Sequence, residues 1–240
     1  SGDVQLSTLD LGPADPAAGL AVSGDRLGDT ATVFVQGSGD QRTLMVATFD
    51  RPPASFSLYT GSGWRNPLRT PLSWSPSTDL WSTVTYIVTI DGVEVGRTTA
   101  TKLPLTAGMG LLDGVHSWQV TAVDRRGQMT STRHRTLRLD QTAPIVDFTL
   151  KRKGSAVTVR TYVSDPRSLA GSAVSGVKAV WISFGDGRRA VRARTATRRL
   201  APGRTYTVRV RAVDRVGNAG TLEQQIEIPG AKRPKPRAKR

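Results

Sequence analysis

Two stretches of the chain, 90 residues apart, carry nearly the same pattern: His116-Ser-Trp-Gln-Val-Thr-Ala-Val-Asp124-Arg-Arg-Gly127-Gln128 and Tyr206-Thr-Val-Arg-Val-Arg-Ala-Val-Asp214-Arg-Val-Gly217-Asn218. In each, a ring, a bulky apolar residue, Val and Ala occupy alternate positions. Alternation with a period of two predicts a strand with one buried face. The Asp and Gly that follow are typical of a tight turn. The stretches therefore predict matching strands in two separate β-sandwiches.

The rest of the chain has the same character. Short alternating runs are separated by clusters of Gly, Pro, Asp and Asn, and helical patterns are almost absent. A chain of 240 residues is long enough for two or three domains. We predict an all-β protein, with tandem Ig-like β-sandwiches after a β-rich N-terminal segment. The boundaries expected from Pro and Gly clusters give segments 1–62, 63–142 and 143–229 and a disordered basic tail, 230–240.

The N-terminal segment contains a weaker repeat. Val4-Gln-Leu-Ser-Thr-Leu-Asp10 resembles Leu44-Met-Val-Ala-Thr-Phe-Asp50, at a spacing of 40 residues. This spacing is near the length of one propeller blade, and a blade cannot bury both faces alone. The segment is therefore either a partial propeller blade, with the chain beginning inside a longer repeat array, or a small sandwich of its own.

Residues 68–140 resemble a fibronectin type III domain. Trp74 stands at the position of that family's buried tryptophan, and Asp91-Gly92 suits a hairpin turn. His116 departs from the pattern, because the family has a tyrosine there. The resemblance implies a sandwich with Trp74 in its core. The stretches that carry it are Leu72-Ser-Trp-Ser-Pro76, Val84-Thr-Tyr-Ile-Val-Thr-Ile-Asp-Gly-Val93 and His116–Asp124.

Residues 145–228 resemble a polycystic-kidney-disease (PKD) type domain, another Ig-like sandwich. Taken together, the chain resembles secreted actinobacterial proteins in which a propeller-like repeat region precedes Ig-like modules. These resemblances imply extracellular or cell-surface roles in adhesion, spacing or glycan association. The stretches that carry the PKD resemblance are Val180-Trp-Ile-Ser-Phe-Gly-Asp-Gly187 and Pro202-Gly-Arg-Thr-Tyr-Thr-Val-Arg-Val210.

Composition limits the chemistry of the chain. It contains no cysteine, which excludes disulfides, thiolate metal sites and cysteine nucleophiles. The formal net charge is +15, and residues 151–240 hold 22 of the 34 basic residues but five of the 19 acidic ones. An anionic partner is therefore expected to meet the C-terminal third. No run of 18 apolar residues is present, so no transmembrane segment is predicted.

No catalytic motif is visible in the sequence. The two histidines, His116 and His134, are expected in a packed strand position and on an exposed strand face. Most aspartates occur in turn contexts such as Asp91-Gly and Asp186-Gly, which turn chemistry explains. We therefore predict that the chain is not an enzyme and needs no cofactor.

The turn aspartates are also candidate metal ligands. Aspartates at sandwich ends can bind Ca²⁺ through oxygen, and Asp124 and Asp214 are the candidates, with Asp165 and Asp186 as neighbours. Turn capping explains the same residues, and the flanking arginines oppose cation binding. The prediction is therefore no metal site.

Arginine placement is the strongest signal of binding. In the strand expected at 206–212, Arg209 and Arg211 alternate with apolar residues, and in 189–199 Arg192 and Arg194 do the same. If these strands share a sheet, the arginines form an outer patch suited to carboxylate or phosphate groups. A solvated outer face explains the pattern equally. Specific nucleic-acid binding is not predicted, because no exposed aromatics are interleaved with the arginines.

The leading functional prediction is an extracellular, non-catalytic binding or spacer module associated with anionic cell-envelope polymer or glycan. Two alternatives remain open at this point. One is an accessory Ig-like region of a larger secreted hydrolase, and the other is an adhesion or structural protein that binds a protein partner.

Overall fold

The computed structural model describes residues 14–26, 28–167 and 174–230. This part of the chain is all-β, as predicted, and its helices are single 3-10 turns. None of the described helices is long and apolar enough to cross a lipid bilayer. The N-terminal repeat at Val4–Asp10 and nearly all of the basic tail lie outside the described residues. The 3-10 turns are η2 (Pro16–Ala18), η3 (Gly39–Gln41), η4 (Pro67–Arg69) and η5 (Ala107–Met109).

Contacts divide the chain into two compact units. The first unit comprises Ser1–Thr60, Leu72–Leu103 and Trp118–Arg135. The second comprises Gly61–Pro71, Pro104–Ser117 and Thr136–Arg240.

The first unit begins with a three-stranded antiparallel sheet. Its order is β1 (Leu20–Gly24), β2 (Thr30–Gln36), β3 (Thr43–Phe49). The central strand alternates buried and half-buried residues, whereas the outer strands leave apolar side chains in solvent. Asp50 follows β3 directly, so the end of this strand places a carboxylate against the rest of the unit. The exposed apolar residues are Leu20, Val22, Leu44, Val46 and Phe49.

A sandwich with Trp74 and Trp118 in its core forms the rest of the first unit. Trp74 is 1% exposed, as the fibronectin-like pattern implies, and its ring lies 5.4 Å from that of Tyr86. Asp91 and Gly92 have positive φ angles of 51° and 80°, which is the hairpin turn predicted between two strands. The strands are β5 (Leu72–Ser73), which pairs with β8 (Lys102–Leu103), β6 (Thr85–Ile90), β7 (Val93–Thr98), β9 (Gly114–Val123) and β10 (Met129–Ser131).

The sheet that contains β9 has the order β4-β11-β9-β6-β7, with β10 also paired to β9. Its remaining strands, β4 (Trp64–Arg65) and β11 (Arg135–Leu139), pair in parallel. The paired residues, Arg138 with Trp64 and Leu139 with Arg65, all belong to the second unit.

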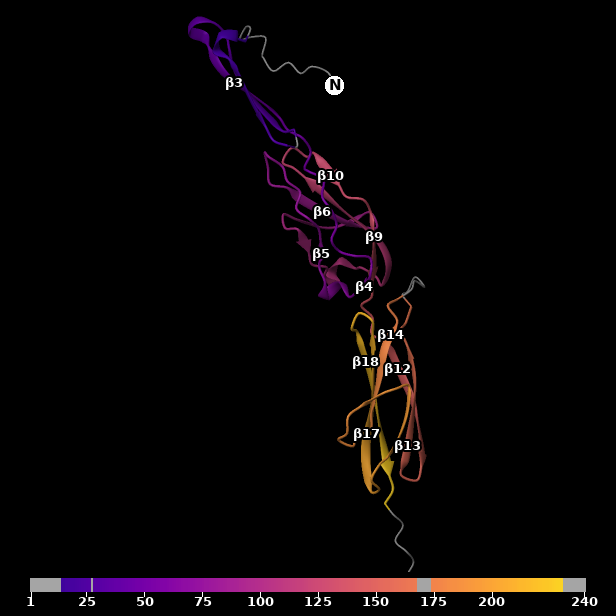
Figure 1. Ribbon diagram of the computed structural model, residues 1–240. Coiled ribbons are helices and arrows are strands. Elements are labelled where there is room, and N and C mark those ends of the chain that lie inside the picture. Colours follow the sequence, from indigo (N-terminus) through magenta and orange to yellow (C-terminus); the bar gives the residue numbers. More distant parts are fainter. Residues whose placement is uncertain (1–13, 27, 168–173, 231–240) are drawn as a thin grey trace, which may run out of the picture. The chain divides into compact units, whose positions relative to one another are not determined.

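The second unit continues as a two-layer sandwich (Figure 1). One layer has the order β12 (Ile145–Lys153), β13 (Ala156–Ser164), β16 (Thr195–Arg199). The other has the order β15 (Val191–Arg192), β14 (Val177–Ser183), β17 (Arg204–Asp214), β18 (Ala219–Ile228). Apolar positions alternate with polar ones along each central strand, so each layer has one apolar face. The apolar faces of the two layers pack together into one core. The fully buried residues of this core are Val157, Val159, Ile182, Phe184, Val208, Val210 and Ala212.

The two repeated stretches are central strands of different sheets, as predicted. The first is β9, between β6 and β10, and the second is β17, between β14 and β18. One expectation is wrong in part: residues 189–199 are not one strand. Val191 and Arg192 pair with β14, whereas Thr195 onward pairs with β13 in the other layer. The chain changes layer between these strands, so its arginines do not all belong to the sheet of β17.

Candidate functional site

The aspartate of each repeated turn caps that turn with one carboxylate oxygen. Asp214 Oδ1 accepts hydrogen bonds from the amides of Val216, Gly217 and Asn218 at 2.6–2.9 Å. Asp124 Oδ1 accepts from the amides of Arg126 and Gln128, both at 2.8 Å. Turn capping therefore accounts for Oδ1 of both aspartates. Asp214 Oδ2 accepts from the side-chain amide of Asn218 at 2.6 Å, whereas Asp124 Oδ2 has no donor.

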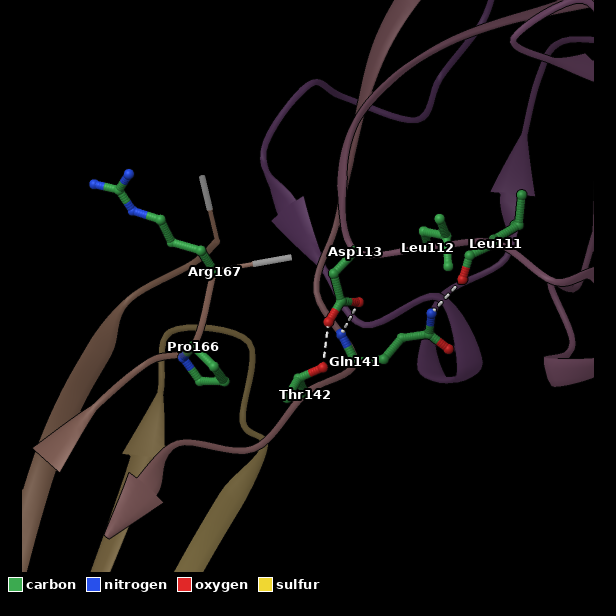
Figure 2. A pocket seen from close by; sticks show the side chains of 7 residues that line it. All are labelled: Leu111, Leu112, Asp113, Gln141, Thr142, Pro166 and Arg167. Carbon is green, nitrogen blue, oxygen red and sulfur yellow. Dashed lines mark hydrogen bonds between the residues drawn. The ribbon is translucent and has the colours of Figure 1, made fainter. Parts of the chain in front are cut away.

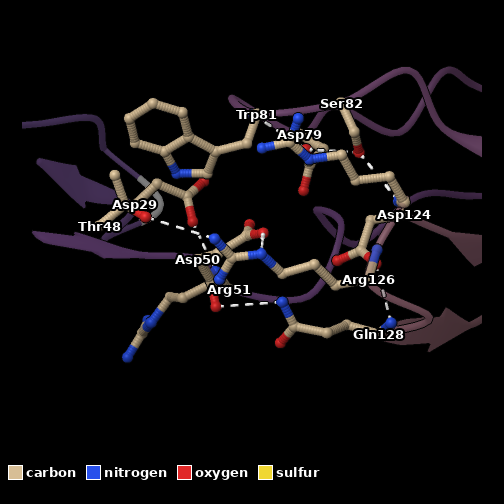
Figure 3. Close-up of polar contacts among 11 residues, drawn as sticks. Asp29, Thr48, Asp50, Arg51, Asp79, Trp81, Ser82, Asp124, Arg126 and Gln128 are labelled. Atoms are coloured by element: carbon tan, nitrogen blue, oxygen red, sulfur yellow. Dashed lines mark hydrogen bonds and ion pairs between the residues drawn. The ribbon is translucent and has the colours of Figure 1, made fainter.

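Asp124 belongs to a group of three carboxylates in the first unit, which we call the Asp50 cluster: Asp50, Asp79 and Asp124 (Figure 3). One oxygen from each lies within 4.8 Å of the others. Asp50 comes from the end of β3, Asp79 from the loop before β6, and Asp124 from the turn after β9. Three acidic groups from distant parts of the sequence thus converge at one point.

Several oxygens of the Asp50 cluster are buried without a hydrogen-bond donor. The Asp50 side chain is 1% exposed, and its Oδ1 has no partner. The same holds for Oδ2 of Asp79 and Oδ2 of Asp124. Asp79 Oδ1, in contrast, accepts from the amide of Trp81 and the hydroxyl of Ser82. Burial, with a smaller effect from the neighbouring carboxylates, raises the pKa of Asp50.

Arg126 is the counter-charge within this cluster. Its Nε lies 2.9 Å from Asp50 Oδ2, and the side chain is 44% exposed. This arginine lowers the pKa of Asp50 and so opposes the effect of burial. The side-chain amide of Gln128 donates to the backbone carbonyl of Asp50 at 3.1 Å and joins the turn to the end of β3. Among the residues that the structure describes, Arg126 is the one basic side chain that forms an ion pair with these three carboxylates.

A second group of three, which we call the Asp140 cluster, lies in the second unit: Asp140, Asp165 and Asp214. Asp140 and Asp214 are fully buried. Asp140 Oδ2 accepts from the amide of Ser175 at 2.8 Å, and Asp165 Oδ2 accepts from the amide of Gly176 at 2.5 Å. Two buried atoms remain without a partner, Asp165 Oδ1 and Ser175 Oγ.

No basic side chain pairs with the Asp140 cluster among the residues that the structure describes. Burial raises the pKa of Asp165 to about 6, and the charges of Asp140 and Asp214 act in the same direction. The hydrogen bond from Gly176 lowers it in part. The fold therefore disfavours the charged form of Asp165.

The two clusters are equivalent in construction. Asp140 and Asp214 stand 90 residues after Asp50 and Asp124. Asn218 repeats the role of Gln128, because its side-chain amide donates to the backbone carbonyl of Asp140 at 3.1 Å. Sequence reasoning selected the turn aspartates but missed Asp50 and Asp140, although their shared spacing of 90 residues was a usable signal. Asp186 is not in either cluster, since it pairs with Arg198 at 2.9 Å.

The arginines predicted to bind anions separate into distinct environments. Arg192 and Arg211 stand opposite Trp181 on the two strands that flank β14, so the three side chains form one cross-strand row. Both arginines are exposed, Trp181 is half-buried, and the Arg211 guanidinium lies 5.8 Å from the centre of its ring. Sequence reasoning missed Trp181 as an aromatic between arginines, because its exposure depends on strand pairing.

The other two arginines differ from this row. Arg209 pairs with Glu223 at 2.6 Å, so its charge is partly compensated. Arg194 helps to line a shallow hollow of about 190 Å³ together with Lys178 and Arg192. Three cationic side chains thus meet at one depression beside the Trp181 row.

The remaining candidates have structural explanations. An open hollow near 440 Å³ includes Asp113, Gln141 and Thr142 (Figure 2). Both oxygens of Asp113 are engaged, one by the Gln141 amide at 2.7 Å and one by the Thr142 hydroxyl. Asp113 therefore secures the segment after β11. His116 is half-buried with Nε2 2.9 Å from the carbonyl oxygen of Leu112. His134 is exposed as expected, but it lies just before β11 and not within a strand.

By sequence, the chain matches no protein-family model, and no curated protein matches it either. By structure, it is similar to the PKD1 domain of Vibrio anguillarum Epp, with 20% identity over 38% of this chain and 98% of the other, at a TM-score of 0.32. The PKD1 domain of the Vibrio cholerae metalloprotease PrtV gives 23% identity over 37% and 99%, at 0.32. Fibronectin(III)-like modules of Clostridium thermocellum CbhA give 12% identity over 78% and 100%, at 0.39. The chain is thus similar to PKD domains and to fibronectin type III modules.

Proposed function

We propose that the chain is a non-catalytic binding and spacer region of an extracellular protein, and that the sheet β15-β14-β17-β18 binds an acidic polysaccharide of the cell envelope. The observation that carries this proposal is the row Arg192, Trp181, Arg211 on the outer face of that sheet. The net charge of the C-terminal third, which exceeds that of the whole chain, supports an anionic partner.

The row offers two kinds of contact that an acidic sugar can use together. The face of a tryptophan ring packs against the apolar face of a sugar ring. Each guanidinium presents a planar fork that fits a carboxylate or phosphate group. The adjacent hollow, lined by Lys178, Arg192 and Arg194, has room for one such group. A polymer chain that crosses the strands would meet the hollow and the row in succession.

The test compares two charge reversals of equal size. Arg192→Glu with Arg211→Glu changes the row, and Arg199→Glu with Arg204→Glu changes two exposed arginines outside it. The row variant is expected to bind polygalacturonate at least about tenfold more weakly at fixed salt, because each charge-assisted hydrogen bond contributes about 1.5–3 kcal/mol. The control is expected to change affinity by less than about threefold. Titration calorimetry measures both.

A third variant, Trp181→Ala, separates sugar recognition from attraction between net charges. It leaves the charge unchanged, so a loss of polygalacturonate binding requires contact with the ring. Equal losses in the two charge reversals, with no effect of Trp181→Ala, would refute the site. Duplex DNA and anionic lipid vesicles serve as the other arms, and tighter binding to either identifies a different class of partner.

A further inference from the structure

The two acidic clusters present an electrostatic problem that the described residues do not solve. Each brings three carboxylates within 4.8 Å of one another. A buried carboxylate is costly unless it is paired and hydrogen-bonded. The Asp50 cluster contains one ion pair, to Arg126, and the Asp140 cluster contains none among the described residues. Each cluster therefore has an excess of negative charge at a buried position.

The unpartnered oxygens indicate where a ligand would lie. As whole residues, Asp50 and Asp124 are 8% and 7% exposed, and each has a buried carboxylate oxygen without a hydrogen-bond donor. Asp165 Oδ1 is the corresponding atom of the Asp140 cluster. Turn capping leaves these atoms unexplained, because the turn amides use Oδ1 of Asp124 and Oδ1 of Asp214. Asp214 Oδ2, unlike Asp124 Oδ2, has a donor, the side-chain amide of Asn218 at 2.6 Å. Buried acceptors without donors point to a cation as the missing partner.

The repeat supplies independent support. Two aspartates and a side-chain amide donor, Gln128 in one cluster and Asn218 in the other, recur 90 residues later, in a different unit. A constellation that arose from the packing of one loop would not be expected twice. Its shared feature is the convergence of carboxylates on one point.

The chemistry of the ligands selects the ion. Every candidate ligand in the two groups is an aspartate oxygen, with no imidazole or thiolate. Hard divalent cations prefer such oxygens, and Ca²⁺ accepts irregular sites of six to eight ligands whereas Mg²⁺ demands near-octahedral geometry. Carboxylates drawn from a strand end, a loop and a turn form an irregular set, which suits Ca²⁺.

We propose that the Asp50 cluster and the Asp140 cluster each bind one Ca²⁺ ion. The Asp140 cluster binds more tightly, because the Asp50 cluster already contains the guanidinium of Arg126. In the first unit the ion joins the end of β3 to the turn after β9. In the second unit it joins the end of β11 to the turn after β17. Ca²⁺ thus stiffens both units at equivalent positions.

The primary experiment uses the chain of residues 1–240, treated with EDTA, desalted and titrated with CaCl₂ in a calorimeter at pH 7. Two ions per chain are expected, with a rise in melting temperature for Ca²⁺ that exceeds the rise for the same concentration of Mg²⁺. Tb³⁺ reports the Asp50 cluster separately, because Trp81, whose amide bonds Asp79, can sensitise its emission. Trp81→Phe is expected to remove that part of the emission.

Two variants assign the ions to the clusters. Asp79→Asn and Asp165→Asn each remove one charge while keeping an oxygen for the hydrogen bonds that the aspartate accepts. Each is expected to weaken one of the two binding events at least about tenfold and to leave the other unchanged. Asp40→Asn is the matched control, since Asp40 is exposed and outside both clusters. Circular dichroism confirms that each variant is folded.

The outcomes decide the proposal for each cluster. No heat and no change in melting temperature at millimolar Ca²⁺ would refute it entirely. A single ion that is lost with Asp165→Asn but kept with Asp79→Asn would refute the site at the Asp50 cluster and show that Arg126 suffices there. Binding that survives both variants would also refute it, because the ions would then lie elsewhere.

Discussion

The Asp50 and Asp140 clusters share the same arrangement of residues but differ in the positive charge beside them. Both combine an aspartate after a strand, an aspartate in the repeated turn and a side-chain amide that joins them. They differ at the second residue after the turn aspartate, which is Arg126 in one and Val216 in the other. One cluster thus has a built-in cation beside Asp50, and the other has none among the described residues.

The third carboxylate of each cluster shows which part of the design is free to vary. Asp79 and Asp165 are separated by 86 residues rather than 90. Asp79 accepts hydrogen bonds from the residues just after it, whereas Asp165 accepts from Gly176, beyond a longer segment. Strands and turns fix two of the carboxylates, and a loop brings the third into place. The common core of the site is therefore set by the repeated sandwich framework.

The largest effect is expected from removing the turn aspartates. Asp214→Ala leaves three backbone amides without their acceptor, whereas Asp124→Ala leaves two. Buried donors that lose a partner cost about 1–3 kcal/mol each, with incomplete additivity. We expect losses in the free energy of unfolding of about 3–5 kcal/mol for Asp214→Ala and about 2–3 kcal/mol for Asp124→Ala.

Urea unfolding in EDTA measures these losses, because it separates turn capping from any bound ion. Conservative Asp→Asn changes at the same positions keep an acceptor oxygen and serve as controls. Equal losses for the two alanine variants would contradict the view that Asp214 holds the more demanding turn.

The next effect concerns the residue by which the clusters differ. Arg126→Val is expected to strengthen Ca²⁺ binding at the Asp50 cluster by about tenfold, since it removes the cation beside Asp50. Val216→Arg is expected to weaken binding at the Asp140 cluster by a similar factor. Calorimetric titration of both variants with CaCl₂ measures the change in Ca²⁺ affinity at each cluster.

Arg125→Val is the control for the general loss of a positive charge next to the same turn, and it is expected to change affinity by less than about threefold. If Arg125→Val and Arg126→Val strengthen Ca²⁺ binding equally, the difference in Ca²⁺ affinity between the clusters comes from net charge. The ion pair between Arg126 and Asp50 would then not explain it.

Sequence reasoning recovered the parts of the fold that local patterns specify. Alternation predicted β9 and β17, the turn motif predicted their ends, and Trp74 is buried as the resemblance to fibronectin type III domains implies. It failed where distant segments decide the outcome. Whether residues 189–199 remain in one sheet depends on two different neighbours, β14 and β13.

The clusters were missed for the same reason. Asp50 and Asp124 meet because β3 ends beside the turn after β9, a contact between residues 74 positions apart that no local pattern encodes. The exposed face of Trp181 likewise depends on its neighbours in adjacent strands. The repeated spacing of 90 residues was a long-range signal in the sequence that relates Asp50 to Asp140 as well as β9 to β17.

The two clusters are also expected to differ in how their Ca²⁺ affinity depends on pH, and this effect is smaller than the effect of Arg126→Val. Burial raises the pKa of Asp165 to about 6 from an ordinary value of 3.8, so the folded state takes up this proton before the unfolded state does. Without Ca²⁺, this group therefore stabilises the fold below pH 4, and the stabilisation is lost as pH rises through 6. Ca²⁺ competes with the same proton, so affinity at the Asp140 cluster is expected to fall by up to about tenfold per pH unit below 6.

Calorimetry at pH 7, 6 and 5 measures this dependence, and Asp165→Asn is the control that should abolish the proton-linked part. The pKa of Asp50 is also raised, but Arg126 opposes that rise. A steeper pH dependence at the Asp50 cluster than at the Asp140 cluster would contradict the assignment.

The smallest effect is on stability without Ca²⁺. Asp165→Asn removes a charge that the fold disfavours and keeps an oxygen to accept from Gly176. After allowance for its partial exposure, we expect it to stabilise the Ca²⁺-free chain by up to about 1 kcal/mol while it weakens Ca²⁺ binding at the Asp140 cluster. Asp79→Asn is expected to change stability less, because Arg126 already offsets part of the repulsion in its cluster. If Asp165 served the structure alone, Asp165→Asn would instead lower the free energy of unfolding in EDTA and leave the Ca²⁺ affinity unchanged.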